Sequence, residues 1–277
     1  MFQSKTLARL LSAAVMAVLA AALLAPAAQA QEPAPGYTQF KGCPTPAQSS
    51  FVEVCVRSDV LDGHLQMGSK DVPIENPLVI TGGVNSELEG FTANSFGGLS
   101  KVKQKVPGGV LGLTGLTWLL EFFGSDALTL YATTELAGAP SEFAFSSVTF
   151  PIKVHLETPS NVLGSNCYIG STASPITLHL ITGTTSPPGP NKPITGKESE
   201  VAVDPELEII KLSGGEYVDN SFAAPGASGC VLKLFGFIPI SLNGFVNSQS
   251  GLPSAAGKNE TRQEFTLELA SQSKVYP

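Results

Sequence analysis

The chain of 277 residues carries 23 acidic and 16 basic side chains, which gives a net charge of −7 at neutral pH. This acidic balance argues against nucleic acid or an anionic membrane surface as a partner, because both are bound through cationic surfaces. Only 14% of the residues are charged, against roughly a quarter in an ordinary soluble domain, whereas glycine (28) and proline (21) are plentiful. Such a composition favours a strand-and-turn protein that works outside the cell.

Residues 1–30 have the parts of a secretory signal peptide: a basic start, an apolar middle and small residues at the end. The basic residues are Lys5 and Arg9, and the apolar stretch 10–24 is shorter than the ~20 residues that a membrane-spanning helix needs. We predict cleavage before Gln31; the alternative is an N-terminal anchor that is never cut. The mature protein is therefore expected to be secreted, extracellular or associated with the cell envelope, with no transmembrane segment after cleavage.

Four cysteines follow the signal, and an even number in an exported chain indicates disulfides. Of the three possible pairings we favour Cys43 with Cys55 and Cys167 with Cys230, because cysteines that are close in sequence are the cheapest to join and the other pair then follows. The alternative is a metal site, but neither a CxxC nor an HxxxH spacing is present. We expect no metal and no cofactor.

After a flexible N-terminal lead (31–50), residues 51–277 are expected to form a single domain, since no domain boundary is evident. Strands are predicted where residues alternate in polarity, or where β-branched runs stop at or near Gly, Pro or Asn. These runs are 51–56, 77–81 (ended by Gly82 and Gly83), 128–134, 148–157, 176–181, 201–212 and 264–269. Without regular strand–helix alternation, the pattern predicts an all-β fold, an antiparallel β-sandwich with short helical or irregular insertions. Residues 182–196 are predicted to be a Pro/Gly-rich loop.

Two apolar segments interrupt this pattern, residues 110–123, which contain the only tryptophan, Trp118, and residues 231–246. Both are too short and too broken by Gly, Thr, Pro or Asn to span a membrane. Each is interpreted as a short helix or hairpin that caps the core. Ordinary core packing is one alternative, and an exposed apolar surface for a lipid or protein partner is the other.

Candidate catalytic groups are few, because the chain has only three histidines, His64, His155 and His179. Alternation along 152–157 places His155 on the polar face of its strand, and alternation along 176–180 does the same for His179. If the two strands pair, the imidazoles could lie close enough to share a metal or a catalytic role; solvent-facing strand positions are the simpler interpretation.

Neither a serine nucleophile nor a calcium loop is evident in the sequence. Gly-x-Ser-x-Gly is missing, and the string at 226–229 lacks the strand and helix that flank a nucleophile elbow. A triad is recognised by geometry, so motifs alone leave the catalytic residues unknown. An acidic run lacks the spacing of a calcium loop and alternates with Val201, Val203, Leu207 and Ile209, which favours a strand with a solvated outer face. The acids are Glu198, Glu200, Asp204, Glu206 and Glu208.

Three strings carry a resemblance: GSNCYIGS at 164–171, TGTTSPP at 182–188 and VDNSFAAPGASGC at 218–230. Together they resemble a family of uncharacterised secreted proteins of actinobacteria, over residues from about 102 to about 257. The resemblance implies export and supports Cys167 and Cys230 as partners, while Cys43 and Cys55 lie outside it. It supplies no catalytic or binding residue.

These observations favour a non-enzymatic secreted or envelope-associated protein with a binding or structural role, whose partner is a cell-wall component, a lipid or another envelope protein. One alternative is a secreted hydrolase with a non-standard site, in which His155 or His179 meets a serine or carboxylate in a cleft. Another is a carrier of a hydrophobic ligand, based on the two apolar segments.

Overall fold

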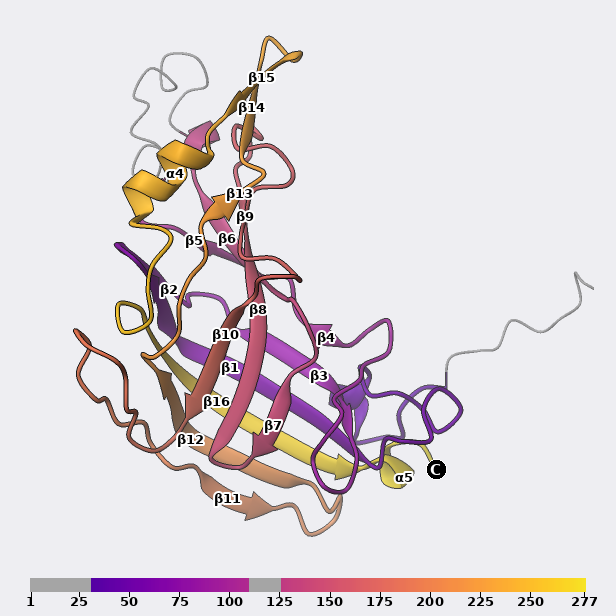
Figure 1. The fold of residues 1–277 in the computed structure, drawn as a ribbon. Coiled ribbons are helices and arrows are strands. Elements are labelled where there is room, and N and C mark those ends of the chain that lie inside the picture. Colours follow the sequence, from indigo (N-terminus) through magenta and orange to yellow (C-terminus); the bar gives the residue numbers. More distant parts are fainter. Residues whose placement is uncertain (1–30, 110–125) are drawn as a thin grey trace, which may run out of the picture. The chain divides into compact units, whose positions relative to one another are not determined.

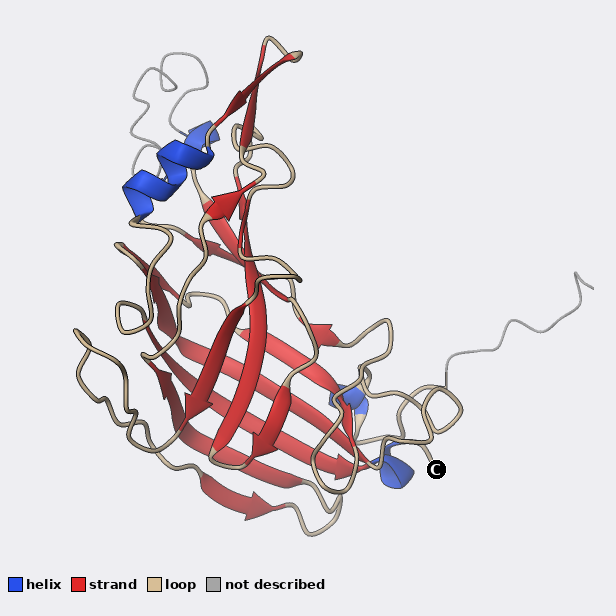
Figure 2. Cartoon of the chain, in the orientation of Figure 1, coloured by secondary structure: helices blue, strands red, loops and turns tan. Residues whose placement is uncertain are grey.

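The computed structural model describes residues 31–109 and 126–277 (Figure 1). The predicted signal peptide and the apolar segment 110–123 lie outside the described residues. The described part of the chain is mostly β-strand, arranged in one antiparallel sheet of 14 strands and a separate two-stranded hairpin. Helix is confined to short pieces, including α4 (Asn243–Ser250) and α5 (Gln272–Val275) (Figure 2). The predicted all-β antiparallel fold is confirmed.

The strands of the large sheet are, in chain order, β1 (Val54–Met67), β2 (Lys70–Pro73), β3 (Leu78–Val84), β4 (Gly98–Leu99), β5 (Lys103–Lys105), β6 (Tyr131–Leu136), β7 (Ser141–Ala144), β8 (Ser147–Glu157), β9 (Tyr168–Ile169), β10 (Ile176–Ile181), β11 (Glu200–Val203), β12 (Ile210–Asp219), β13 (Ala227–Ser228) and β16 (Glu260–Ser271). The hairpin consists of β14 (Val231–Leu234) and β15 (Ile238–Ser241). Two 3₁₀ turns complete the described elements, η1 (Thr38–Phe40) and η2 (Asp126–Leu128).

The large sheet folds over on itself into two layers. Strands β12, β16, β1 and β3 are neighbours in one layer, called here the β1 layer, and β10, β8 and β6 are neighbours in the β8 layer. The layers are joined where β10 pairs with β12 at one position, Ile181 opposite Val218. Figure 1 shows β8 and β10 crossing in front of β1 and β16. The main core lies between the layers and combines Ile152 and Leu178 with Tyr217 and Phe265.

Strands β8 and β10 form where alternation predicted them, and β10 has the predicted bounds. In β10 the side chains of Ile176, Leu178 and Leu180 are buried while His179 is exposed. A register slip of one residue would turn this whole apolar set towards solvent, so burial of one face fixes the register.

Strand β3 continues through Gly82 and Gly83, where the sequence had predicted its end. Both glycines are paired with β1, and neighbouring side chains occupy the space that a Cβ atom would need. A Cβ on Gly82 would lie 2.5 Å from the ring of Phe91, and one on Gly83 would lie 2.3 Å from the side chain of Val52. The glycines therefore permit close packing within the strand and do not end it.

The run 201–212 forms two strands, β11 and β12, where one had been predicted. Between them the Asp204 carboxylate accepts hydrogen bonds from the backbone N–H groups of Glu206 (3.0 Å) and Leu207 (3.1 Å), which lower the pKa of Asp204. This side-chain turn reverses the chain. As a consequence, Val201 and Val203 lie exposed on an outer strand, whereas Ile209 is fully buried.

The segment expected to be a flexible lead contributes to the fold, and residues 33–277 form one compact unit. Phe40 and Cys43 are buried in a small second core together with Val275 near the C-terminus. The backbone N–H of Ala34 donates to the carbonyl of Val275 (2.8 Å). The structure contains both predicted disulfides, Cys43–Cys55 in this second core and Cys167–Cys230 beside the main one.

Candidate functional site

The candidate site is an apolar cavity of about 100 Å³ between the two layers. The β1 layer contributes alternating inward positions of β1 and β16, including Val56, Phe265 and Leu267. The β8 layer contributes the matching inward positions, including Val154 and Leu178. Because strand side chains alternate between faces, the lining residues of each strand are spaced two apart over the part that borders the cavity, as in Gln263, Phe265 and Leu267 of β16.

The described lining residues carry no formal charge. Four bear hydroxyl or amide groups, namely Ser58, Gln104, Thr134 and Gln263, and one is a tyrosine, Tyr217. The others are aliphatic or phenylalanine: Val56, Val60, Leu65, Met67, Val72, Ile74, Leu78, Ile80, Phe91, Leu99, Ala132, Phe143, Ala144, Val148, Phe150, Ile152, Val154, Leu178, Leu180, Phe265 and Leu267.

Three of the four polar side chains of the lining have hydrogen-bond partners within the protein. Gln104 is buried, and its Oε1 accepts from the backbone N–H groups of Glu75 and Asn76 (both 3.0 Å), while its Nε2 donates to the carbonyl of Asn76 (2.6 Å). The hydroxyl of Ser58 donates to a carbonyl of β16 (3.0 Å). The amide of Gln263 donates to the hydroxyl of Thr261 (3.2 Å). These bonds hold the polar groups against the walls.

One wall of the cavity is a stacked aromatic pair. The rings of Tyr217 and Phe265 lie 3.8 Å apart and within 8° of parallel. Gly215, which pairs with Phe265 just after a register irregularity in β12, leaves room for the ring, since a Cβ there would lie 2.8 Å from it. Burial raises the pKa of Tyr217, and the nearby carboxylate of Glu198 raises it further, so the phenol stays neutral.

The chemistry of the cavity follows from this lining. Cavities lined by aliphatic and aromatic side chains stay dry, because water inside them finds too few hydrogen-bond partners. An apolar guest displaces no bound water there and gains dispersion contacts with the walls. The site is therefore suited to holding an apolar group by shape and contact.

Two of the candidate histidines lie on the predicted strand faces but do not come together. His179 is exposed and sits opposite Thr149 in the pairing of β10 with β8. His155 lies six residues further along β8, roughly 20 Å away at the rise of a strand, and its ring stacks on Tyr168 at a centroid distance of 4.6 Å. The register of the two strands thus separates the pair that the sequence could have joined.

His179 takes part in a surface chain of hydrogen bonds with a hydroxyl and a carboxylate. The Thr149 hydroxyl donates to the Glu142 carboxylate, and its oxygen lies 3.0 Å from His179 Nδ1. A hydroxyl has one proton, and an ionised carboxylate can only accept, so the imidazole must donate to Thr149. The histidine is consequently not placed to withdraw the hydroxyl proton as a general base, and the group lies on an exposed face, not in a cleft.

His64 and two of the acidic candidates, Glu198 and Glu208, have local partners. His64 Nδ1 lies 3.0 Å from an oxygen of Asp71 on the adjacent strand β2. Glu198 accepts from the hydroxyl of Thr182 (2.7 Å), and Glu208 lies 3.0 Å from Lys274. Among the residues that the structure describes, no group of three or more His, Cys, Asp or Glu side chains is arranged to hold a metal ion.

No pattern in the sequence identifies the cavity. Its described lining comes from strands spread between positions 56 and 267, and an inward apolar residue beside a void has the same pattern as one in a filled core. The carrier hypothesis was based on two apolar segments, of which 231–246 does not line the cavity and 110–123 lies outside the described residues. The signal that was present is the high share of inward valine, leucine and isoleucine on both layers.

Comparisons with known proteins give no family from which a function could be inferred, so the function is inferred from the sequence and the structure. No family model, curated protein or solved structure matches the chain. In the described part of the chain, no helix is both long and apolar enough to cross a membrane.

Proposed function

We propose that this is an exported, non-enzymatic binding protein that holds an apolar ligand between the two layers of its folded sheet. The observation that carries the proposal is the cavity of about 100 Å³, whose described lining carries no charge and keeps most of its polar groups bonded to the protein. The carrier interpretation of the sequence had different grounds, namely the two apolar segments 110–123 and 231–246.

The volume sets the class of ligand. Cavities on the order of 150 Å³ lined by similar side chains accept a benzene-sized molecule in other proteins. A smaller cavity fits a small apolar ring or the end of an alkyl chain, and the described lining gives a charged head group no opposite charge. The ligand is therefore an apolar molecule, or the apolar part of an amphiphile whose head remains outside.

The place of action is outside the cytoplasm. Two disulfides persist under oxidising conditions, and the N-terminal 30 residues have the pattern of a secretory signal. The resemblance to secreted actinobacterial proteins supports the same place. Secretion or retention at the envelope would bring the protein to the apolar molecules found there.

Binding of benzene, an apolar probe of a size that the cavity can hold, tests the proposal, measured as the rise in melting temperature with probe concentration. Ala132 lines the cavity and is 7% exposed, whereas Ala137 is 9% exposed and lies outside the described lining. Ala132→Leu fills part of the cavity, so we expect about tenfold weaker probe binding, comparable to the loss of one to two buried methylene contacts. Ala137→Leu, which adds the same volume at similar burial, serves as the control and should bind as the unchanged protein does. Equal binding by all three proteins would refute the proposed site.

A further inference from the structure

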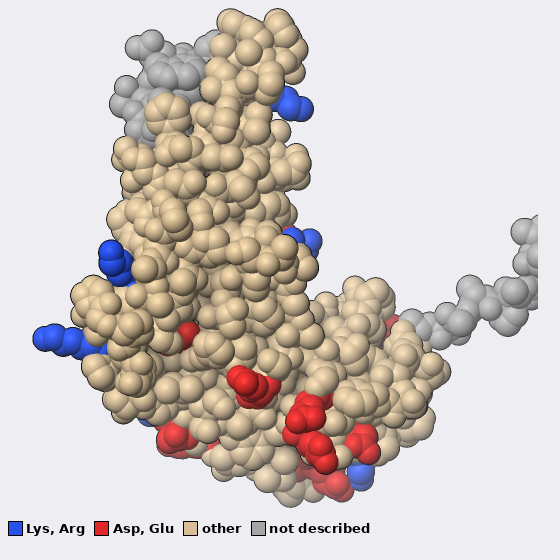
Figure 3. Space-filling view, viewed as in Figure 1, with Lys and Arg blue, Asp and Glu red and all other residues tan. Residues whose placement is uncertain are grey.

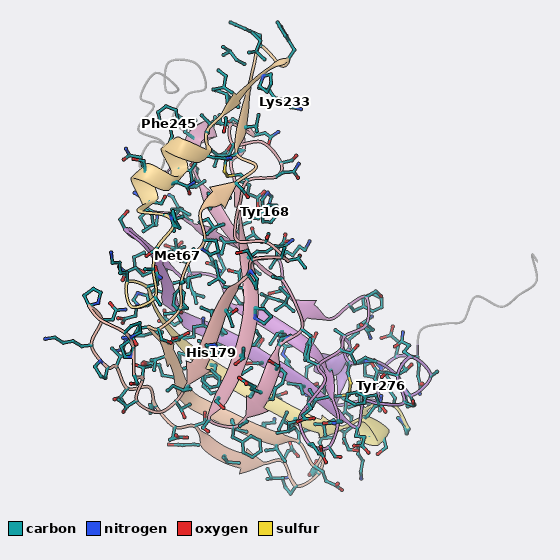
Figure 4. All side chains as sticks on the ribbon, in the orientation of Figure 1. Met67, Tyr168, His179, Lys233, Phe245 and Tyr276 are labelled. Atoms are coloured by element: carbon teal, nitrogen blue, oxygen red, sulfur yellow. A yellow bond between two sulfur atoms is a disulfide. The ribbon has the colours of Figure 1, made fainter. Side chains whose placement is uncertain are left out.

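The end of the molecule formed by β14, β15 and α4 carries large apolar side chains on its surface. Phe237 is 75% exposed, Ile238 is 42% exposed and Phe245 is 45% exposed. We call these three residues the aromatic tip. Phe237 and Ile238 belong to the hairpin turn and the start of β15, and Phe245 lies on the adjoining helix α4 (Figure 4).

The aromatic tip stands on a firmly bonded base. The Cys167–Cys230 disulfide immediately precedes β14, and the backbone N–H of Cys230 donates to the side chain of Asn243 (2.9 Å). Asn247 on α4 holds Ala227 twice, accepting from its N–H (2.6 Å) and donating to its carbonyl (3.1 Å). The exposed position of the tip is thus a property of an anchored structure.

The turn of the hairpin contains a phenylalanine where the backbone geometry favours asparagine or glycine. Phe235 and Gly236 both have positive φ, +52° and +84°. Asparagine and glycine adopt such angles most easily, and they are the usual residues of short hairpin turns. Phe237, which follows these two residues, is 75% exposed and is not part of the main core, so its side chain is available for contact with something outside the chain.

The segment 220–259, which includes the hairpin and α4, is weakly cationic, although the chain as a whole is acidic. Residues 220–259 contain no Asp or Glu, and their charged side chains are Lys233 and Lys258. Figure 3 shows the acidic side chains of the viewed face gathered at the end opposite β14 and β15. The net charge of −7 therefore describes the whole chain and not this end, where Lys233 is exposed beside the tip (Figure 4).

We propose that the aromatic tip inserts into the interface of a lipid bilayer, with Lys233 placed at the level of the head groups. Surface-bound segments bury large apolar side chains such as phenylalanine at the boundary between head groups and acyl chains, and a carboxylate at the tip would oppose insertion through its desolvation and its repulsion from phosphates. A protein partner fits less well, because a stable protein interface covers about 800 Å² on each side, whereas Phe237 and Ile238 stand on a two-stranded hairpin that projects from the rest of the chain (Figure 1).

Co-sedimentation of the oxidised mature protein with lipid vesicles tests this proposal. One set of vesicles contains phosphatidylcholine alone and the other contains equal parts of phosphatidylcholine and phosphatidylglycerol, both at low ionic strength. The unchanged protein should sediment with both sets, and more strongly with the anionic one. Phe237→Ser should reduce the partition coefficient about tenfold, since it removes one inserted aromatic ring, and F237W should restore it. Lys233→Glu should weaken binding to the anionic vesicles more than binding to the neutral ones.

Phe145→Ser is the matched control, because Phe145 is also an exposed phenylalanine next to a turn, 47% exposed between β7 and β8. This variant should sediment as the unchanged protein does. Failure of the unchanged protein to sediment with either set would overturn the proposal and leave a protein as the occupant of the tip. An equal loss in F145S and F237S would overturn it as well, because insertion would then not involve the tip. Probe binding in the cavity is expected to be unaffected by F237S, so the two proposals succeed or fail separately.

Discussion

At the scale of single residues, Tyr217 shows how the cavity combines an aromatic wall with a polar group that stays uncharged. Its ring stacks on Phe265, and its burial raises the pKa of the phenol. This tyrosine keeps its proton in the folded state but can ionise in the unfolded chain. Its contribution to the free energy of unfolding therefore changes with pH only in the alkaline range. The sign follows directly: above the unfolded pKa of about 10 the unfolded chain loses a proton that the folded chain retains.

We therefore predict that stability falls on going from pH 9 to pH 11, and that Tyr217→Phe removes part of the fall. For one such group the difference at pH 11 is about 1.4 kcal/mol in the free energy of unfolding. Urea denaturation of both proteins at the two pH values measures it. Identical alkaline losses in the two proteins would mean that Tyr217 ionises as freely in the folded protein as in the unfolded chain.

Residue patterns predicted part of the candidate chemistry correctly. Alternation placed His155 and His179 on the polar faces of their strands, as observed. Their separation could not be predicted, because it depends on the register between β8 and β10, which no local pattern encodes. The cavity was beyond prediction for a related reason: alternation shows which way a side chain points, but not whether the facing layer fills the space.

At the scale of elements, the sequence predicted strands well where one face is apolar and poorly where glycine occurs. The bounds of β10 agree with alternation alone, and β8 differs by one residue. In β3 the pair Gly82 and Gly83 was interpreted as a stop. Glycine marks both turns and close approaches, and only the packed structure distinguishes the two, here through Phe91 and Val52.

Close packing around Gly83 in β3 predicts that Gly83→Ala is destabilising. The new Cβ would lie 2.3 Å from the side chain of Val52 and 3.2 Å from Cys43 Sγ, both buried, so we expect a loss of about 1–3 kcal/mol from overpacking. Gly183→Ala is the control, because nothing lies within 4 Å of its Cβ position, and its effect should stay within about 0.5 kcal/mol. Urea denaturation checks both variants, and equal stabilities would show that β3 does not depend on close packing at Gly83.

At the scale of the whole molecule, one sheet supplies both walls of the proposed binding site. The β1 layer and the β8 layer are joined at Ile181 and Val218, and the inward faces of both are apolar along most of their length. The hairpin of β14 and β15 is separate from this sheet, so the proposed lipid contact and the proposed ligand binding use different parts of the chain. The two proposals rest on separate observations, an uncharged lining among the described residues of the cavity and a segment, residues 220–259, that contains no Asp or Glu.

The most direct test of the central claim is a crystal structure of the oxidised mature protein under xenon pressure. Xenon enters dry apolar cavities, so we predict a xenon atom between the two layers, in contact with Leu178 and Phe265 from opposite walls. A cavity filled by ordered water, or closed by the side chains around it, would contradict the account that this protein binds an apolar ligand there.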